Sequence, residues 1–295
     1  MRPRAAAAGL GLLLDRLIGE PPASAHPVAW FGRVMGRVET ACYRDQRRAG
    51  ALYTAAGLAA GIATGLAVTS TTVAVAIASA GRMLRDEARA IARLVTSDDL
   101  GRARDRLPAL CGRDPSELDG SGLAAAVIES VAENTVDAVV APALWGALLG
   151  APGALGYRAV NTMDATVGHR GGRYEQFGWT AARLDDAANL VPARVTALLV
   201  MVACPARRRS VWWAVRRDAP RHPSPNAGVA EAAFAGALGV RLGGRLRYGA
   251  RVEERPELGD GRRPSACDID AAVRLADRIE LLLATGLLCW GVTGS

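Results

Sequence analysis

The chain has 295 residues, of which 50% are hydrophobic and 22% are charged, and it carries a formal net charge of +7. All 36 basic residues are arginines, which excludes a Walker A phosphate loop and a lysine Schiff base, because both require a lysine amine. The mean hydropathy of +0.12 leans towards a membrane protein. The positive charge favours a small anionic substrate, a phosphate group or a lipid surface. Nucleic acid is disfavoured as a partner, because the arginines are interspersed with acids and form no basic strip with aromatic residues.

The N-terminal half contains the clearest apolar segment. Residues 51–80 carry no charge, and about 20 apolar residues are enough to cross a bilayer, so this segment predicts a membrane span. Residues 5–18 predict a short apolar helix in front of a proline-rich turn. Asp15 and Arg16 interrupt that helix too early for a cleaved signal peptide. Residues 82–137 are charged over most of their length and predict a polar helical connection.

Three further apolar segments follow. Residues 138–157 contain an internal proline and a Gly-Ala-Pro-Gly turn, so they predict a helix plus a turn, or a discontinuous span. Residues 190–206 and 281–295 are the other two. The arginines balance on the two sides of 51–80, so the positive-inside rule gives no orientation. We therefore predict one all-α domain over 1–295, a polytopic integral membrane protein with about three to five spans; a soluble helical enzyme is the alternative.

Three acids, Glu129, Glu133 and Asp137, follow one another at intervals of four residues. On a helix they share one face, and like charges at this spacing repel each other. We therefore expect arginines or Mg²⁺ to lie against them, since magnesium binds carboxylate oxygens and shares its coordination with substrate phosphates. A solvated acidic face in front of a span is the competing interpretation.

The densest polar segment lies between residues 161 and 194, next to an apolar run. Its glycines allow close approach of a backbone, and its arginines offer forked donors for phosphate or carboxylate. Asp186 lies three residues from both Arg183 and Asn189, so the three can lie on one face of a helix; an ordinary helix ion pair is the alternative for Arg183 and Asp186. The candidate ligand-binding residues in and before this segment are Asn134, Asn161, Asp164, Arg170, Arg173, Arg183, Asn189 and Arg194.

Another polar segment leads into the alanine-rich residues 226–240. It contains Arg221, His222, Ser224 and Asn226. Serine or asparagine in front of such a helix is a good N-cap, and a helix N-terminus with nearby arginines also binds anions. Both interpretations stay open.

Taken in order, these motifs resemble the adenosylcobinamide-phosphate synthases of cobalamin biosynthesis, the CobD/CbiB family. The similarity covers most of the chain and includes "LLLDRLIGEPP", "HPVAWFGRVMGRVE", "GRD", "ESVAENTVDAVVAP", "YRAVNTMDATVGHRGGRYEQFGWTAARLDDAANLVPAR" and "RDAPRHPSPNAGVAEAAFAGALGVRLGG". Two positions depart from the family pattern: His169 stands where an aromatic residue such as tyrosine is expected, and Pro115 stands where threonine is expected.

The resemblance implies a multi-pass protein of the inner (cytoplasmic) membrane. It also implies an acid–amine ligase that joins (R)-1-amino-2-propanol, or its O-phosphate, to the propionate carboxylate of adenosylcobyric acid, with ATP as co-substrate and Mg²⁺. No nucleotide-binding motif is recognisable. The expected partners are these substrates, membrane lipid and other membrane enzymes of nucleotide-loop assembly.

Amide formation needs an activated carboxylate, most simply an acyl phosphate, and phosphoryl transfer depends on metal and arginine charge. The predicted catalytic acids are Glu129, Glu133, Asp137, Asp185 and Asp186, with Glu133, Asp137 and Asp186 as Mg²⁺ ligands. The predicted phosphate-binding residues are Arg170, Arg173, Arg183 and Arg194, with Arg221, His222 and Asn226 in secondary roles. Which of Asp185 and Asp186 meets the metal stays open, because neighbours on a helix point about 100° apart.

Two other functions remain as alternatives. An intramembrane prenyltransferase-type enzyme would also hold Mg²⁺ with acids at helix ends, but the acids here lack a paired N-x-x-x-D spacing. A corrinoid transporter would need charges inside its spans, whereas these charges flank them.

Overall fold

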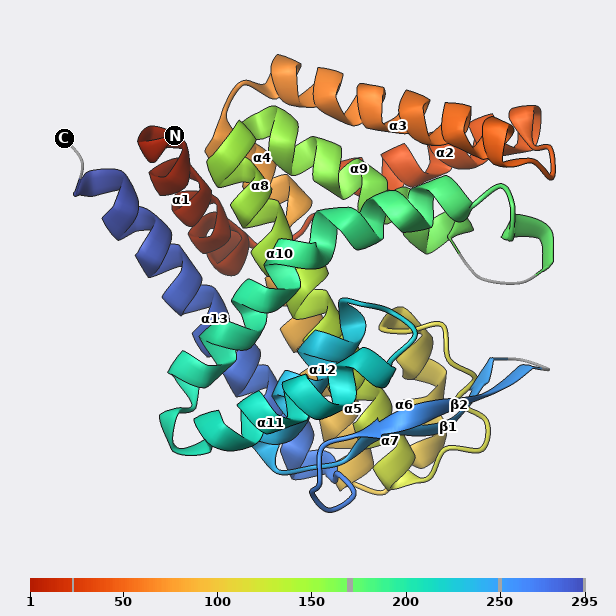
Figure 1. Ribbon diagram of the computed structural model, residues 1–295, viewed down its shortest axis with the longest axis vertical. Helices are drawn as coiled ribbons and strands as arrows, with labels where there is room; N and C mark the ends of the chain where they lie inside the picture. Colours follow the sequence, from red (N-terminus) through yellow and green to blue (C-terminus); the bar gives the residue numbers. More distant parts are fainter. Residues whose placement is uncertain (23, 169–171, 249–250, 294–295) are drawn as a thin grey trace. The chain divides into compact units, whose positions relative to one another are not determined.

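The computed structural model describes residues 1–22, 24–168, 172–248 and 251–293, and apart from one β-hairpin their regular secondary structure is helical (Figure 1). The all-α class is therefore confirmed. The chain forms two compact units. Unit 1 consists of Met1–Gly81, Asp137–Pro192 and Leu283–Ser295, and unit 2 consists of Arg82–Val136 and Ala193–Leu282.

Unit 1 is built around two helices that run side by side, α3 and α9 (Figure 1). Helices α1, α4 and α8 pack against one another beside them. The elements of this unit are α1 (Arg2–Ile18), α2 (Pro27–Cys42), α3 (Arg47–Val68), α4 (Thr71–Ala78), most of the π-helical turn η2 (Val136–Val140), α8 (Ala141–Leu149), α9 (Ala151–Val167), the 3₁₀ turn η3 (Gly172–Tyr174), the first part of α10 (Trp179–Ala203) and the end of α13 (Ala266–Val292).

The predicted span at 51–80 is not one helix. It is divided between α3 and α4 at Thr69, which has a φ of +57°. Ser70 then caps α4, since its side chain accepts a hydrogen bond from the backbone N–H of Val73. Absence of charge shows that a segment is apolar, but a run of serine and threonine side chains competes for the backbone and can end a helix inside it.

The other apolar segments also differ in their bounds. The break expected within 138–157 is confirmed, because Gly150 has a φ of +73° and separates α8 from α9. Helix α10 begins before residue 190, and α13 (Ala266–Val292) begins before residue 281. Both helices continue through polar turns that hydropathy alone assigns to connections.

Two helices in the described part of the chain are long and apolar enough to cross a membrane, α3 and α10. The other apolar segments expected to span give helices that are too short or too polar for this test. Within the apolar windows of α3 and α10, 28% and 33% of the residues are buried, whereas the core helix of a soluble protein is mostly buried. The structure thus supports two candidate spans where the apolar segments predict three to five.

Helices α3 and α9 approach closely because glycines of α3 lie against α9. A Cβ on Gly61 would lie 2.7 Å from the Cβ of Ala159 and 2.8 Å from the carbonyl oxygen of Leu155. A Cβ on Gly65 would lie 2.4 Å from the Cα of Pro152. Backbone atoms cannot move aside as the end of a side chain can, so the contact depends on the missing side chains.

Replacing Gly65 by alanine is therefore expected to lower the free energy of unfolding by about 1–3 kcal/mol through overpacking. The matched control is Gly36→Ala in α2, where a Cβ would meet nothing within 4 Å. There the substitution is expected to stabilise the helix by about 0.5–1 kcal/mol, since alanine has the higher helix propensity. Thermal unfolding of the two variants in detergent measures both effects, and equal shifts in Tm would contradict the prediction.

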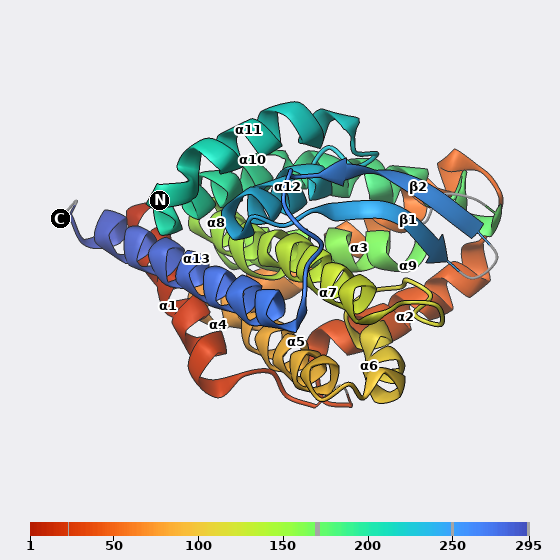
Figure 2. The same cartoon turned by 90° about the horizontal axis from the view of Figure 1, so that it is seen from below.

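Unit 2 is a helical layer with a two-stranded hairpin (Figure 2). Helix α12 packs against both α7 and α11. The sequence patterns do not predict the antiparallel pair of β1 and β2, whose register runs from Leu242↔Leu258 to Tyr248↔Arg251. The elements are α5 (Gly81–Thr96), α6 (Leu100–Arg106), η1 (Leu107–Ala109), α7 (Gly120–Thr135), the end of α10, η4 (Pro205–Arg207), α11 (Arg208–Asp218), η5 (Ala219–Arg221), α12 (Ala227–Leu238), β1 (Leu242–Tyr248), β2 (Arg251–Leu258) and most of α13.

Candidate functional site

Unit 1 holds a group of carboxylate and amide side chains that we call the aspartate cluster: Asp137, Asn161, Asp164, Asp185 and Asn189. The Nδ2 of Asn161, on α9, donates to Asp137 Oδ2 and to Asp185 Oδ1, each at 3.2 Å. The Nδ2 of Asn189 donates to the other oxygen of Asp185 at 3.0 Å. One amide thus holds two carboxylates next to each other, from η2 and α10.

The orientation of both amides in the aspartate cluster follows from their other partners. Arg158 Nη1 donates to Asn161 Oδ1 at 3.2 Å, and the Tyr157 hydroxyl donates to Asn189 Oδ1 at 2.9 Å. Since each amide oxygen accepts from its own donor, each Nδ2 is directed at a carboxylate. Asp185 is 9% exposed and Asn189 is 1% exposed. This arrangement fixes Asp185 in place through two amides on different helices.

The pKa of Asp164 is affected by the negative charge gathered in and beside the aspartate cluster. Burial, and then the negative charges of Asp185 and Asp186, raise the pKa of Asp164 to about 7. Carboxylates that crowd together and resist ionisation are stabilised by a cation, and magnesium takes one or two carboxylates together with substrate phosphates. The donor chemistry therefore fits Mg²⁺. Among the described residues, however, no group of three or more His, Cys, Asp or Glu side chains is arranged to hold a metal, so such an ion would need oxygens from substrate.

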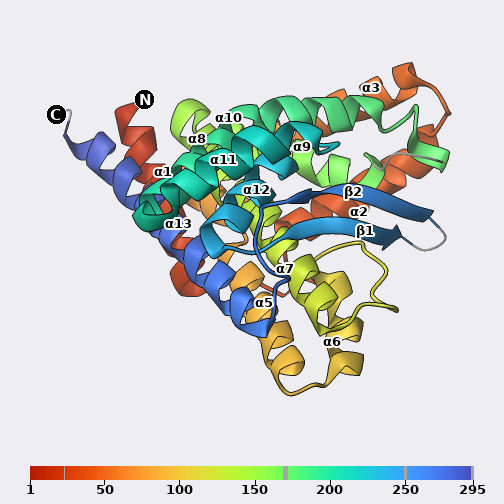
Figure 3. The same ribbon diagram turned by 60° about the horizontal axis from the view of Figure 1, so that its bottom comes forward.

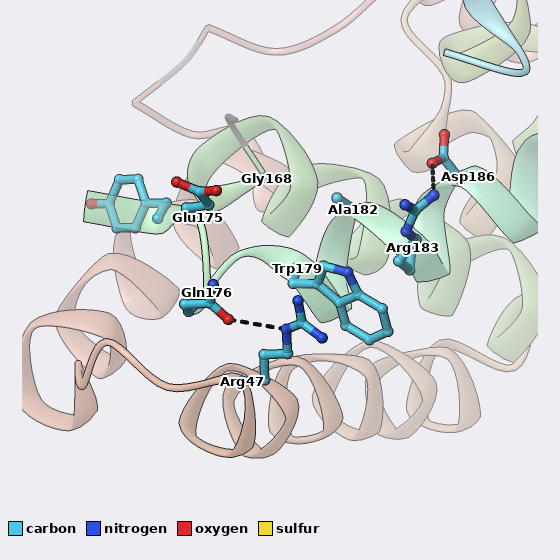
Figure 4. A pocket seen from close by; sticks show the side chains of 9 residues that line it. Arg47, Gly168, Glu175, Gln176, Trp179, Ala182, Arg183 and Asp186 are labelled. Atoms are coloured by element: carbon cyan, nitrogen blue, oxygen red, sulfur yellow. Dashed lines mark hydrogen bonds and ion pairs between the residues drawn. The ribbon is translucent and has the colours of Figure 1, made fainter. Parts of the chain in front are cut away.

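Asp186 has different surroundings from Asp185. It lines a cavity of about 220 Å³ in unit 1 together with Arg47, Trp179 and Arg183 (Figure 4). Arg183 lies 3.6 Å from Asp186, as its spacing of three residues predicts. The guanidinium of Arg47 lies 4.8 Å from the centre of the Trp179 ring, and its Nε donates to Gln176 Oε1 at 3.0 Å. Asp185 thus lies in a buried network of amide side chains, and its neighbour Asp186 lines a cavity with two arginines. Asn189 is directed at Asp185, four residues before it, rather than at Asp186.

Arg173, another predicted phosphate-binding arginine, does not line this cavity. Arg173 donates to Glu39 Oε1 at 2.8 Å, and its guanidinium lies 4.2 Å from the centre of the Tyr43 ring. Arg173 therefore connects η3, in which it lies, with the C-terminal end of α2. Arg170 lies outside the described residues.

Unit 2 holds a second polar site, which we call the glutamate cavity. Its volume is about 150 Å³, and its charged lining residues are Glu129, Glu133, Glu231, Arg113 and Arg255. Arg113 donates to Glu129, whose other oxygen accepts from the backbone N–H of Gly243 at 2.7 Å. The cavity therefore contains acids of α7 and α12 together with two arginines.

Glu133 and Glu231 form a hydrogen-bonded carboxyl pair. Burial, and then the charges of Glu133 and Glu129, raise the pKa of Glu231 well above its usual range. Burial also raises the pKa of Glu133, but the hydrogen bond from Glu231 opposes that shift. Glu231 is therefore the protonated member of the pair, and it donates a hydrogen bond to the carboxylate of Glu133.

The predicted residues 221–226 and Arg194 lie around α12. The Nε2 of His222 is 3.7 Å from Glu231 Oε1, so His222 lies beside the carboxyl pair. Ser224 Oγ accepts from the backbone N–H of Asn226 and of Ala227 at the start of α12, whereas the side chain of Asn226, the N-cap residue, makes no capping hydrogen bond. Arg194 Nη1 donates to Asn226 Oδ1 at 2.8 Å. Arg221 is exposed and lies 3.8 Å from Asp218, and Asn134 bonds to Ser130 in its own helix.

The chain is similar to proteins of one family over most of its length. A family model described as "CobD/Cbib protein" matches residues 8–276. A protein of Mycobacterium tuberculosis named "Cobalamin biosynthesis protein CobD" is 50% identical over 286 residues, which cover 92% of this chain and 91% of that protein. The chain belongs to the CobD/Cbib family. It is therefore a cobalamin biosynthesis protein, and the resemblance seen in its motifs is confirmed.

Two further relatives carry the same name. The CobD/Cbib protein of Chromobacterium violaceum is 44% identical, over 91% of each chain, and that of Klebsiella pneumoniae is 38% identical, over 94% of this chain and 95% of the relative. No solved structure matches this chain.

Several residues at the two sites of this CobD/Cbib protein were missed by sequence reasoning. Glu231 had a usable signal, because it is the single acid in an otherwise apolar helix and such charges are costly unless they serve a purpose. Arg113 belongs to the "GRD" motif, but nothing there indicates a partner. Arg255 lies in a strand that the patterns do not predict. Arg47, Arg158 and Trp179 were likewise not singled out.

Glu231→Gln is expected to change how stability depends on pH in this CobD/Cbib protein. A carboxyl whose pKa is raised by folding takes up a proton on folding. The free energy of unfolding of the wild type therefore falls as pH rises from 4.5 towards the folded value, by about 1.4 kcal/mol per pH unit for one proton. Glutamine resembles the protonated acid and can still donate to Glu133, so the variant should gain stability relative to the wild type as pH rises.

The measurement is denaturant unfolding between pH 4 and pH 9. The control is Glu257→Gln, since the Glu257 side chain is 57% exposed. Parallel curves for the wild type and Glu231→Gln would show that Glu231 ionises normally in the folded protein.

Proposed function

We propose that this protein is an adenosylcobinamide-phosphate synthase, an ATP-dependent ligase. It forms an amide between (R)-1-amino-2-propanol, or its O-phosphate, and the propionate carboxylate of adenosylcobyric acid. The observation that carries the proposal is the pair of carboxylates, Asp137 and Asp185, held on the single amide of Asn161. Family membership in cobalamin biosynthesis supports the identity of the substrates.

The residues of unit 1 suit activation of the carboxylate. A magnesium ion bound there would neutralise phosphate charge during phosphoryl transfer. Asn161 and Asn189 keep the Asp185 carboxylate oriented, so its oxygens need no rearrangement when a ligand arrives. Arg47 and Arg183, in the cavity that Asp186 lines, offer forked donors to phosphate oxygens.

The glutamate cavity suits the amine. Its mixture of acids and arginines matches a small molecule that carries an ammonium group and a polar or phosphorylated end. Glu133, held as an acceptor by the proton on Glu231, is the group that we assign to take the proton that the amine nitrogen loses on forming the amide. The activated carboxylate gives up phosphate in the same step, so one amide, one phosphate and one proton result.

The proposal also places the protein in the inner membrane as a multi-pass protein that contacts lipid. The two apolar helices α3 and α10 support this location. Contacts with other membrane enzymes of nucleotide-loop assembly belong to the same proposal.

The deciding experiment is an assay of the purified protein in detergent with adenosylcobyric acid, Mg-ATP and each of the two amines. We expect a product heavier than adenosylcobyric acid by the amine minus one water, and one phosphate released for each amide. Reactions without ATP, or with a magnesium chelator, are the controls. Absence of product with both amines would overturn the proposal, and uptake of corrinoid by proteoliposomes without ATP or amine would favour a transporter.

A further inference from the structure

Helix α11 carries two exposed tryptophans among arginines. Trp212 is 51% exposed and Trp213 is 63% exposed. Between residues 205 and 217 there are five arginines and no acid. Two large aromatic side chains left open to solvent on a strongly basic helix indicate a surface that meets a partner.

The exposed and buried residues of α11 lie on opposite faces. Val211, Ala214 and Asp218 are its buried residues, and at about 100° per residue they fall within one narrow sector of the helix. Four exposed residues fall together in the opposite sector: Arg209, Trp212, Trp213 and Arg216. The helix therefore presents a continuous face of tryptophan and arginine, which we call the Trp-Arg face.

The buried face fixes α11 on unit 2 (Figure 3). A Cβ on Gly236 of α12 would lie 2.8 Å from the carbonyl oxygen of Ser210 and from the Cα of Val211. Asp218, 1% exposed, accepts from both Arg217 and the backbone N–H of Gly259. Because these contacts prevent rotation of α11, the tryptophans cannot turn inward to be buried within unit 2.

The chemistry of the Trp-Arg face matches the headgroup region of a bilayer. Tryptophan is enriched at this level of membrane proteins, and arginine forks pair with lipid phosphates. The preceding helix supports this choice, because Leu198 and Val202 in its last turns are 57% and 63% exposed. An apolar helix end followed after a few residues by a basic, tryptophan-bearing helix is the order expected where a chain leaves the hydrocarbon core.

We propose that α11 is an interfacial helix whose Trp-Arg face binds the anionic lipid surface. Trp212 and Trp213 lie among the headgroups, and Arg209 and Arg216 contact lipid phosphates. The surface is that of the cytoplasmic leaflet, which carries the anionic lipid that basic segments prefer. Unit 2 is thereby held against the membrane at the end of α10, independently of the reaction catalysed.

The experiment uses tryptophan fluorescence of the full chain in vesicles. A variant in which Trp30, Trp145, Trp179 and Trp290 are phenylalanine leaves only the two tryptophans of α11. We expect vesicles of phosphatidylcholine with phosphatidylglycerol to give blue-shifted emission. Lipids brominated near the headgroup should quench this emission more strongly than lipids brominated deep in the acyl chain. Acrylamide in the aqueous phase should quench it weakly.

Two double variants test whether the charges of Arg209 and Arg216 contribute to lipid binding. Arg209→Gln with Arg216→Gln should lose most of the extra quenching that phosphatidylglycerol produces over phosphatidylcholine alone. Arg241→Gln with Arg263→Gln removes the same charge from exposed positions elsewhere on unit 2 and should leave that quenching unchanged. Emission that acrylamide quenches freely in both kinds of vesicle would overturn the proposal and leave the face to an aqueous partner, such as an acidic protein. Equal losses in the two double variants would overturn the role of Arg209 and Arg216.

Discussion

Glu133→Gln and Asp186→Asn are each expected to lower amide formation by at least about 100-fold, the contribution typical of a positioned acid, base or charged group. Glu133 would lose its ability to take a proton from the amine. Asp186 would lose its negative charge in the arginine-lined cavity. Both side chains keep their size, so the amount of protein in membranes should be unchanged.

The assay is product formation by the purified variants, identified by mass. The matched controls are Glu257→Gln and Asp86→Asn, which make the same chemical changes at exposed ion pairs. Both controls should turn over normally. Normal turnover by both Glu133→Gln and Asp186→Asn would contradict the proposed assignment of these acids.

The largest effect on stability is expected at a buried ion pair in unit 2. Arg85 of α5 donates to Glu280 of α13, and their side chains are 5% and 0% exposed. Asp277 lies 3.6 Å from the same guanidinium. Arg85→Ala should lower the free energy of unfolding by about 3–5 kcal/mol, because it removes one partner of a buried ion pair. For a chain of this size, each kcal/mol corresponds to roughly 2–4 °C in Tm.

The double variant Arg85→Met with Glu280→Leu separates charge from packing. Replacing both members of a buried pair by apolar residues of similar volume is often neutral or stabilising. The double variant should therefore be more stable than Arg85→Ala in thermal and denaturant unfolding. A double variant as unstable as the single one would mean that packing rather than charge dominates this contact.

For the neighbouring residues Asp185 and Asp186, the sequence predicts part of the candidate site but not the surroundings of each side chain. The spacing of Asp185 and Asp186 shows that they point in different directions, but it does not show what each meets. The structure surrounds Asp185 with two amides from different helices and places Asp186 in a cavity with two arginines. Those amides come from residues 161 and 189, so their meeting depends on how α9 packs against α10.

In the glutamate cavity, the sequence likewise predicts two of the acids but not the residues that meet them. The interval of four residues between Glu129 and Glu133 is enough to predict a shared helix face, and both acids line the cavity. Their countercharges were expected in general terms, as arginines or Mg²⁺. Arg113 and Arg255 are separated by more than a hundred positions in the chain. Arg255 lies in β2, and the sequence around it shows no periodic pattern that predicts this strand.

Composition and local pattern by themselves determined the helical class and the absence of lysine chemistry, and the order of the motifs indicated the family. The sequence also singled out four of the residues that line the two cavities: Glu129, Glu133, Arg183 and Asp186. These properties depend on residue identity and on short spacings, which a sequence displays directly. Only the tertiary structure decided that 51–80 divides at Thr69, that Arg173 binds Glu39, that Glu231 donates to Glu133 and that α11 exposes its tryptophans. Each of these depends on contacts between segments far apart in the chain, or on competition between side chain and backbone, and no local pattern records the outcome of either.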